Sequence, residues 1–151
     1  MFNLHLVRNI SCSHRLNLHN GKCNNLHGHN YKVEVDIETD NIIDAPVSSD
    51  GMVCDFGDVK NIIDSLDHQD LNSYFEEKIK GFDTDNLIAT LSTQPTAERL
   101  AKWLAIEIFK KVKNTNSFAH KLEVKVTIFE TENCSASYTR KGLINEGSKN
   151  I

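Results

Sequence analysis

No stretch of this sequence is apolar over the roughly 20 residues that a membrane-spanning helix needs. The alternating residues at 1–8 also lack the continuous apolar segment of a signal peptide. We therefore expect a cytoplasmic protein with no membrane partner. Basic residues are not in excess, since 17 Lys and Arg stand against 21 Asp and Glu for a net charge of −4. Nucleic-acid binding usually requires a basic face, so we expect no nucleic-acid partner.

Proline occurs only twice in the 151 residues, and the chain has no Pro/Gly-rich linker, internal repeat or low-complexity segment. We predict a single domain over 1–142, followed by a frayed tail over 143–151. The four cysteines form no Cys-x-x-Cys pair, which favours free thiols in a reducing compartment. Three of them are interpreted as mostly buried thiols: Cys12, Cys54 and Cys134.

The pattern of apolar residues predicts an α+β fold. Four segments alternate apolar and polar side chains as half-buried strands do: 2–6, 31–37, 122–128 and about 134–140. Two segments repeat apolar residues at helical spacing: 56–66 after an Asp55 cap, and 95–112. Residues 67–94 are expected to be mostly irregular. The order predicts a four-stranded antiparallel sheet with two helices on one face. Its two open edges favour an oligomer that closes a barrel.

Two histidines, His27 and His29, directly precede the strand at 31–37 and share the phase of its apolar residues. Extending that strand backward places both side chains on one face, with Cα atoms about 6.6 Å apart. Imidazoles at that separation can share one Zn²⁺ through bonds of about 2.0–2.1 Å. Gly28 between them permits a bend or a close approach of the backbone. Two ordinary polar histidines at the start of a strand are the alternative.

His14 strengthens the metal interpretation, because it lies beyond the first strand, the natural antiparallel neighbour of the second. The intervening loop would return the chain beside His27 and His29. Three neutral imidazoles leave a fourth tetrahedral position open, as catalytic rather than structural zinc requires. We therefore predict a zinc ion held by these three histidines.

Cys23 lies four residues before His27 and has three interpretations. It is a fourth zinc ligand, which would make the site structural, a thiolate base beside the metal, or an inert loop thiol. Among the other histidines, His5 and His120 are interpreted as surface residues. His19 is interpreted as a loop residue and is kept as a competing third ligand.

The Asp67-His68 pair and Glu130 are further candidates for functional residues. His68 follows Asp67, and a histidine backed by an acid is a plausible proton shuttle, although a polar helix end is the alternative. Glu130 keeps the even-numbered phase of the apolar residues at 122–128, which predicts that it faces the buried side. A buried carboxylate costs several kcal/mol unless it is paired, so a ligand with N–H donors would satisfy it. If the strand ends at Phe129 instead, Glu130 is in solvent.

Taken together, these residues resemble the 6-pyruvoyl-tetrahydropterin synthase / 6-carboxytetrahydropterin synthase family. The resemblance covers roughly residues 2 to 140 and keeps the family's order of motifs. The motifs are Ser-His14-Arg-Leu, Cys23-Asn-Asn-Leu-His27-Gly-His29, Gly51-Met-Val-Cys-Asp55-Phe, Leu66-Asp67-His68-Gln-Asp-Leu-Asn72, Pro95-Thr-Ala-Glu98 and Phe129-Glu130-Thr131. No single motif is specific, but the ordered set is.

The resemblance implies a tunnelling fold whose subunits assemble barrels with active sites at their interfaces, with a hexamer built as a dimer of trimers favoured. It implies zinc on the three histidines already predicted. It implies that Cys23 is the general base and that Asp67 and His68 complete a proton-transfer system. It also implies that Glu130 anchors the 2-amino-pyrimidinone edge of a pterin, helped by the segment around Thr96.

The substrate implied by the resemblance is 7,8-dihydroneopterin triphosphate, whose side-chain hydroxyls zinc would acidify. The queuosine branch of the family is a lyase that makes 6-carboxy-5,6,7,8-tetrahydropterin and releases acetaldehyde, whereas the biopterin branch makes 6-pyruvoyl-tetrahydropterin. The short spacing from Cys23 to His27 resembles the queuosine branch. Candidates for binding the triphosphate are Arg15, Lys22 and Lys32. A non-catalytic zinc module with Cys23 as the fourth ligand is the alternative of another class.

Overall fold

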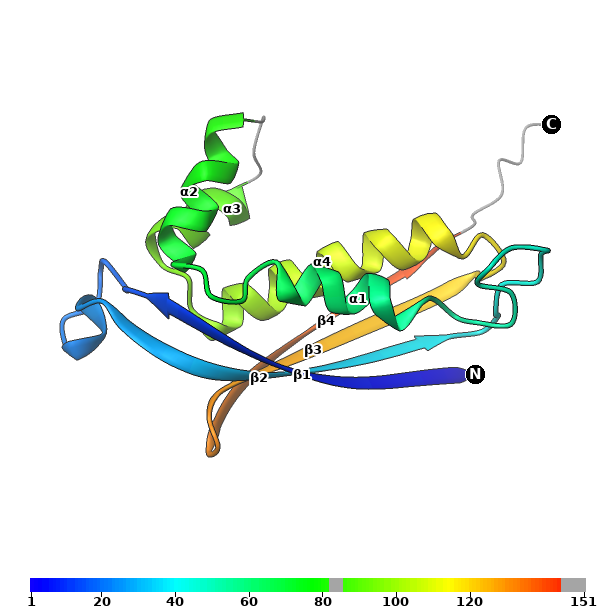
Figure 1. The fold of residues 1–151 in the computed structure, drawn as a ribbon, viewed down its shortest axis with the longest axis horizontal. Helices are drawn as coiled ribbons and strands as arrows, with labels where there is room; N and C mark the ends of the chain where they lie inside the picture. The colour runs from blue at the N-terminus through cyan, green and yellow to red at the C-terminus, as the bar shows by residue number, and fades with distance from the viewer. Residues whose placement is uncertain (82–85, 145–151) are drawn as a thin grey trace.

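The computed structural model describes residues 1–81 and 86–144. Its four strands form one antiparallel sheet in the order β1-β2-β3-β4 (Figure 1). The strands are β1 (Phe2–His14), β2 (His27–Thr39), β3 (Lys121–Thr131) and β4 (Cys134–Leu143). The predicted four-stranded antiparallel sheet is therefore confirmed. Each strand is longer than its alternating apolar residues indicated, because polar residues continue the pairing at the strand ends.

Helices cover one face of this sheet (Figure 1). α1 (Phe56–Asp64) and α4 (Ala97–Thr115) lie along it, as the two apolar stripes predicted. Asp55 caps α1 by accepting a hydrogen bond from the Gly57 amide at 2.7 Å. Thr96 caps α4, its hydroxyl accepting from the Arg99 amide at 3.3 Å. The core therefore lies between α1, α4 and the inward residues of the strands.

The expectation of an irregular segment over 67–94 is wrong. This segment holds two further helices, α2 (Leu71–Gly81) and α3 (Asn86–Thr93), which stand upright at one end of the sheet (Figure 1). Leu71, Phe75 and Leu91 are buried and anchor the pair to the core. The remaining residues are mostly polar, so the apolar stripe is too sparse to reveal a helical period in the sequence.

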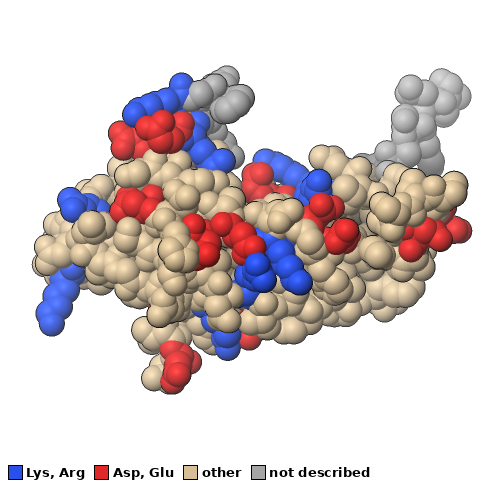
Figure 2. Space-filling view, viewed as in Figure 1, with Lys and Arg blue, Asp and Glu red and all other residues tan. Residues whose placement is uncertain are grey.

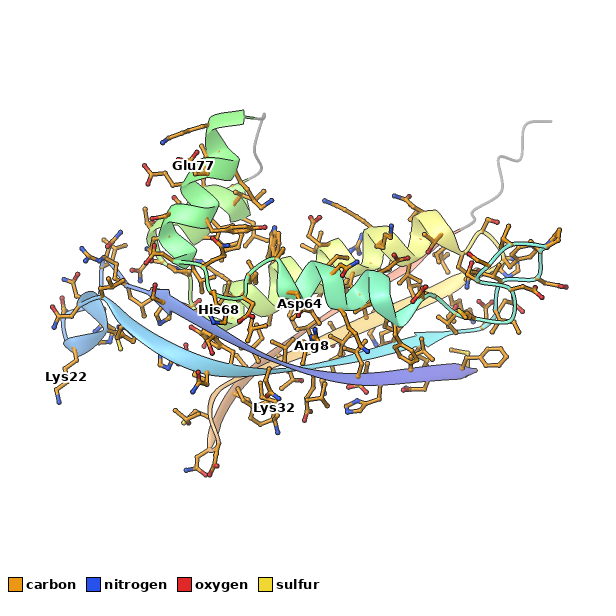
Figure 3. All side chains as sticks on the ribbon, in the orientation of Figure 1. Arg8, Lys22, Lys32, Asp64, His68 and Glu77 are labelled. Carbon is orange, nitrogen blue, oxygen red and sulfur yellow. The ribbon has the colours of Figure 1, made fainter. Side chains whose placement is uncertain are left out.

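Asp70 fastens the start of α2 to β1, and Arg8 fastens the end of α1 to the same strand. Asp70 accepts a hydrogen bond from the Ser73 amide at the start of α2, at 3.0 Å. Its second oxygen accepts from the Ser13 hydroxyl on β1, also at 3.0 Å. Arg8 on β1 makes a two-pronged ion pair with Asp64 on α1, at 2.7 and 2.6 Å (Figure 3). The segment between α1 and α2 is consequently held against the edge of β1.

β4 continues to Leu143, and residues 145–151 of the expected tail lie outside the described residues. Cys12 and Cys54 are buried as expected, but Cys134 is exposed, because it begins β4 next to the turn after β3. None of the helices over 1–81 and 86–144 is long and apolar enough to cross a bilayer. The face shown in Figure 2 intersperses charges of both signs.

Candidate metal centre

The pairing of β1 with β2 brings the three predicted histidines together. His14, the last residue of β1, is paired directly with His27, the first residue of β2. His29 follows two residues along β2, on the same face. One ligand nitrogen from each of the three lies within 4.8 Å of the others. His14 is buried at 1% exposure, while His27 and His29 are half-buried.

Backbone carbonyls fix the tautomers of two of these rings. His14 Nδ1 lies 2.9 Å from the carbonyl oxygen of Pro95, and His27 Nδ1 lies 2.6 Å from that of Asn25. A carbonyl oxygen only accepts hydrogen bonds, so each Nδ1 must carry the proton and donate. In the neutral rings, each Nε2 then presents a lone pair. This arrangement of a ring N–H held by a backbone oxygen is typical of metal-ligating histidines.

The two Nε2 atoms of His14 and His27 are 3.1 Å apart. Two lone pairs that face each other at this distance repel, and neither atom has a hydrogen to donate. Tetrahedral zinc with Zn–N bonds of 2.0–2.1 Å places its ligand nitrogens about 3.3 Å apart. The donor set and its spacing therefore fit a divalent cation that prefers imidazole ligands.

The surroundings favour the neutral imidazole that metal binding requires. Burial lowers the pKa of His14, the Pro95 carbonyl opposes that effect, and the neighbouring His27 and His29 lower it further. Burial also lowers the pKa of His29, against the opposing charge of Glu130. Tyr31 lies beneath the cluster, with its ring centroid 5.3 Å from that of His29. Burial raises the pKa of this tyrosine, which therefore stays a neutral phenol.

Glu130 shares a pocket with the metal cluster. It lines an open cavity of about 780 Å³ together with His29, Lys32 and Phe129. Its negative charge opposes the effect of burial on the pKa of both His14 and His29. It is half-buried rather than fully buried, because the β3–β4 register shifts between Phe129 and Thr131. Within the described ranges, no side chain forms a salt bridge with Glu130.

Asp67 and His68 do contact each other, with Asp67 Oδ2 3.0 Å from His68 Nδ1. The other Asp67 oxygen accepts from the Ser11 amide on β1 at 2.8 Å. That hydrogen bond lowers the pKa of Asp67, against a smaller effect of desolvation and with help from His68. His68 has a positive φ of 60° and donates its amide to the Ser11 carbonyl. Its ring, labelled in Figure 3, is exposed and lines a second pocket together with His29.

Cys23 is half-buried in a 3-10 turn, η1 (Lys22–Asn24), in the loop between β1 and β2. The loop is closed at its base by the Leu16 amide, which donates to the Cys23 carbonyl at 2.8 Å. Among the described residues, the cluster of potential ligands consists of the three histidines without Cys23. Cys23 is therefore close to His27 in the sequence, but its thiol is not part of the cluster of ligand atoms.

The remaining histidines lie at the surface, as expected. They are His5, His19 and His120. His5 pairs with Asp36 at 2.7 Å on the sheet face away from the helices. His19 uses its Nδ1 to accept the Gly21 amide within the loop, at 2.8 Å. It therefore does not join the cluster as a competing ligand.

Several contacts around the site have no signature in the sequence. The acceptors for the two fixed rings are the backbone carbonyls of Asn25 and Pro95, which any residue could supply. Thr96 occupies its hydroxyl in capping α4, and it immediately follows Pro95. The only sequence signal for this region was the short motif Pro95-Thr-Ala-Glu98, which predicted a helix start. In the structure, the carbonyl of Pro95, just before this helix, also accepts a hydrogen bond from His14, a candidate metal ligand.

Comparisons with known proteins find relatives in one family. The family model of 6-pyruvoyl tetrahydropterin synthase matches residues 4–141. A 6-carboxy-5,6,7,8-tetrahydropterin synthase of Rickettsia bellii is 32% identical over 134 residues, covering 83% of this chain and 91% of the relative. A probable 6-carboxy-5,6,7,8-tetrahydropterin synthase of Halobacterium salinarum is 31% identical, covering 85% of this chain and 83% of the relative.

A solved structure shows the same architecture. The 6-pyruvoyl tetrahydropterin synthase of Caenorhabditis elegans superposes with a TM-score of 0.54 at 28% identity, covering 92% of this chain and 95% of that chain. The fold is the tunnelling fold that the resemblance implied. Because the family model spans nearly the whole chain and its relatives match along most of their length, this chain belongs to the 6-pyruvoyl tetrahydropterin synthase family.

Proposed function

We propose that the chain is a zinc-dependent lyase that converts 7,8-dihydroneopterin triphosphate to 6-carboxy-5,6,7,8-tetrahydropterin, with release of acetaldehyde and triphosphate. The observation that carries the proposal is the pair of Nε2 lone pairs held 3.1 Å apart beside a third histidine. The names of the curated relatives support the carboxy product. When bound by His14, His27 and His29, Zn²⁺ supplies Lewis-acid chemistry to the hydroxyls of the substrate side chain.

Glu130 is proposed to recognise the pterin ring. Its carboxylate opens into the cavity shared with His29 and accepts no hydrogen bond recorded for the described residues. Two carboxylate oxygens match the adjacent N–H donors of a 2-amino-pyrimidinone edge, and such charge-assisted pairs are the strong ones. Binding the ring there would place its side chain toward the histidines. Thr96 is proposed to contribute through the backbone around the start of α4.

Proton transfer is assigned to Cys23, Asp67 and His68. Asp67 holds His68 Nδ1 at 3.0 Å, which leaves His68 Nε2 free to exchange a proton. The Ser11 amide keeps Asp67 ionised, so the carboxylate orients the ring without taking its proton. Cys23 would act as the thiolate base that removes a proton from the substrate side chain.

The triphosphate requires cations, and the three candidates differ in position. Lys32 lines the same cavity as Glu130, with Nζ 4.1 Å from the centre of the Phe129 ring. Lys22 stands at the outer tip of the β1–β2 loop, and Lys32 projects from the sheet on the side away from the helices (Figure 3). Arg15 is exposed next to His14. We propose Lys32 for this role, because of the three candidates it is the one that lines the cavity of Glu130.

We also propose that the chain forms a homo-oligomer. β1 and β4 are the outer strands of the sheet, and both are long. The outer edge of β1 is hydrogen-bonded at Ser11 and Ser13 to the segment 67–70, and among the described residues no strand pairs with this edge. Joining β1 of one subunit to β4 of another would satisfy these edges and close a barrel. A hexamer made of two trimers is the proposed assembly, and light scattering on the purified protein tests it.

The test of the reaction is incubation of the zinc-loaded protein with 7,8-dihydroneopterin triphosphate, followed by mass spectrometry of the products. Formation of the carboxy product with one acetaldehyde per turnover supports the proposal. The 6-pyruvoyl product is the second candidate, because the family model and the Caenorhabditis elegans structure carry that name. Finding it as the sole product would assign the chain to the other branch. Absence of any turnover would favour a zinc module without catalysis.

A further inference from the structure

The side-chain amide of Asn72 joins three segments of the chain beside the metal cluster. Asn72 lies in the first turn of α2, in the last position of the motif that begins at Leu66. Its Oδ1 accepts the Arg15 amide at 2.9 Å, and its Nδ2 donates to the Arg15 carbonyl at 3.0 Å. The second hydrogen of Nδ2 is donated to the Ser92 carbonyl on α3, at 3.1 Å. All the donors of this amide are therefore used.

Both of the other segments lead to His14. Arg15 is the residue that follows His14, so the two hydrogen bonds to its backbone fix the end of β1. Ser92 lies three residues before Pro95, whose carbonyl accepts from His14 Nδ1 at 2.9 Å. Asn72 thus holds the backbone that carries the histidine and the segment that supplies its ring acceptor.

We propose that Asn72 is a positioning residue for the metal centre, which sets the orientation of the His14 imidazole. The inference rests on the proposed metal site. Ligand nitrogens must converge within a few tenths of an ångström for a tetrahedral ion, and residues that orient ligands typically affect metal affinity 10- to 100-fold. An asparagine fits this position because it accepts once and donates twice from one short side chain.

Close analogues of asparagine lack this combination. Aspartate keeps the shape and the acceptor for the Arg15 amide, but it has no hydrogen for the Arg15 and Ser92 carbonyls. Its charge would also face those two oxygens. Alanine removes all three hydrogen bonds. Both substitutions should therefore loosen the orientation of His14 without changing any of the three proposed ligands.

Asn116 provides a matched control. It is a buried asparagine that likewise clamps several backbone segments, donating to the carbonyls of Asn41 at 3.0 Å and Val53 at 3.1 Å. It caps the C-terminus of α4, whereas Pro95 lies before the N-terminus of this 19-residue helix. At 1.5 Å per residue, the two ends are roughly 28 Å apart. Losing Asn116 should cost stability at a distance from the metal.

The experiment compares the full-length wild type with Asn72→Ala, Asn72→Asp and Asn116→Ala. The Kd for Zn²⁺ is measured by competition with a chromophoric chelator, well below each variant's Tm. The visible spectrum of the Co²⁺-substituted proteins reports ligand geometry. We expect both Asn72 variants to bind Zn²⁺ roughly 10- to 100-fold more weakly and to show an altered Co²⁺ spectrum. Asn116→Ala should lower the Tm while leaving the Kd and the spectrum unchanged.

Two results would overturn the inference, and they are distinguishable. If the wild type binds Zn²⁺ and His14→Ala abolishes binding, but both Asn72 variants keep the wild-type Kd and Co²⁺ spectrum, Asn72 is only structural. If the wild type itself binds no Zn²⁺ or Co²⁺, the proposed metal site fails and the role of Asn72 fails with it.

Discussion

His14 and His27 face each other across the β1–β2 pairing with their Nε2 atoms 3.1 Å apart. Each ring donates its Nδ1 proton to a backbone carbonyl, so neither Nε2 can donate to the other. The folded chain thus brings two acceptors into contact, which costs free energy unless a cation lies between them. The fold stabilises this arrangement through β-pairing and through the contacts of Pro95 and Asn25.

We expect one zinc per chain, and we expect His14→Ala to lose it. The substitution removes one of the two facing acceptors and leaves a two-histidine site. Elemental analysis of the purified variants measures the stoichiometry. His19→Ala is the control, because His19 lies in the loop and its Nδ1 accepts a hydrogen bond from the Gly21 amide. Full zinc in His14→Ala, or loss of zinc in His19→Ala alone, would show that the third ligand has been assigned wrongly.

Zinc should also stabilise the folded state, because the unfolded chain does not bring the histidines together. A free zinc concentration 100 times the Kd adds about 2.7 kcal/mol to the free energy of unfolding. Thermal melts with zinc and with excess chelator measure this difference. The difference should vanish in His14→Ala. A chelator-insensitive Tm in the wild type would contradict a metal site formed by these histidines.

Cys23→Ala should nearly abolish turnover while zinc stays bound. The thiol is absent from the cluster of ligand atoms, and three histidines already leave a position open for substrate. Product formation and zinc content are measured on the same preparation. Cys134→Ala is a suitable control, because this exposed thiol lies in the turn region at the start of β4. Joint loss of zinc and activity in Cys23→Ala would instead indicate a four-ligand structural site.

Asp40 makes folding stability depend on pH. Partial burial raises the pKa of Asp40, but hydrogen bonds from the His120 and Lys121 amides and the His120 ring outweigh it and lower the pKa to about 2. Because the folded-state pKa lies below the unfolded value, the stabilisation is present above about pH 4 and is lost as the pH falls through about 2. We expect Asp40→Ala to lose about 1–2 kcal/mol at neutral pH.

Urea unfolding of Asp40→Ala and wild type across this pH range measures the effect. The difference in the free energy of unfolding should shrink as the pH approaches 2. Asp44→Ala, which removes an exposed carboxylate from the same connection, should change stability little at any pH. A difference between Asp40→Ala and wild type that does not depend on pH would contradict the assigned hydrogen bonds.

Much of the fold followed from local pattern because the sheet and its two long helices each present a regular apolar face. The Asp55 cap predicted the start of α1. The alternation of inward and outward side chains in β2 continued back to His27 and His29. The strand phase placed His27 and His29 on one face, and the expected antiparallel pairing with the first strand added His14. The prediction failed for α2 and α3, where few residues meet the core.

Contacts between residues far apart in the sequence could not be predicted from local sequence patterns. The carbonyl of Pro95 meets His14 across 81 positions, and a backbone oxygen has no residue type to reveal it. The contact between Asp67 and His68 accompanies a positive φ at His68, whose amide donates to the Ser11 carbonyl on β1. Cys134 keeps the phase of the alternating apolar residues of β4. It is, however, the first residue of this outer strand, and its side chain is exposed.

Glu130→Gln should raise the KM strongly while zinc content stays normal. The carboxylate lies in the cavity with His29 but is not a member of the ligand cluster. The amide would keep one acceptor oxygen and present an NH₂ group to an N–H donor of the ring. Losing one charge-assisted hydrogen bond of about 1.5–3 kcal/mol corresponds to a rise in KM of roughly tenfold to hundredfold.

The matched control is Glu132→Gln, which makes the same chemical change in an exposed residue lining the same cavity. If the effect came only from the net charge of the cavity, both variants would raise the KM alike. If Glu130 holds the ring directly, only Glu130→Gln will do so, and zinc content will equal that of the wild type in both. Unchanged kinetics in Glu130→Gln would mean that this half-buried carboxylate serves the fold rather than the substrate.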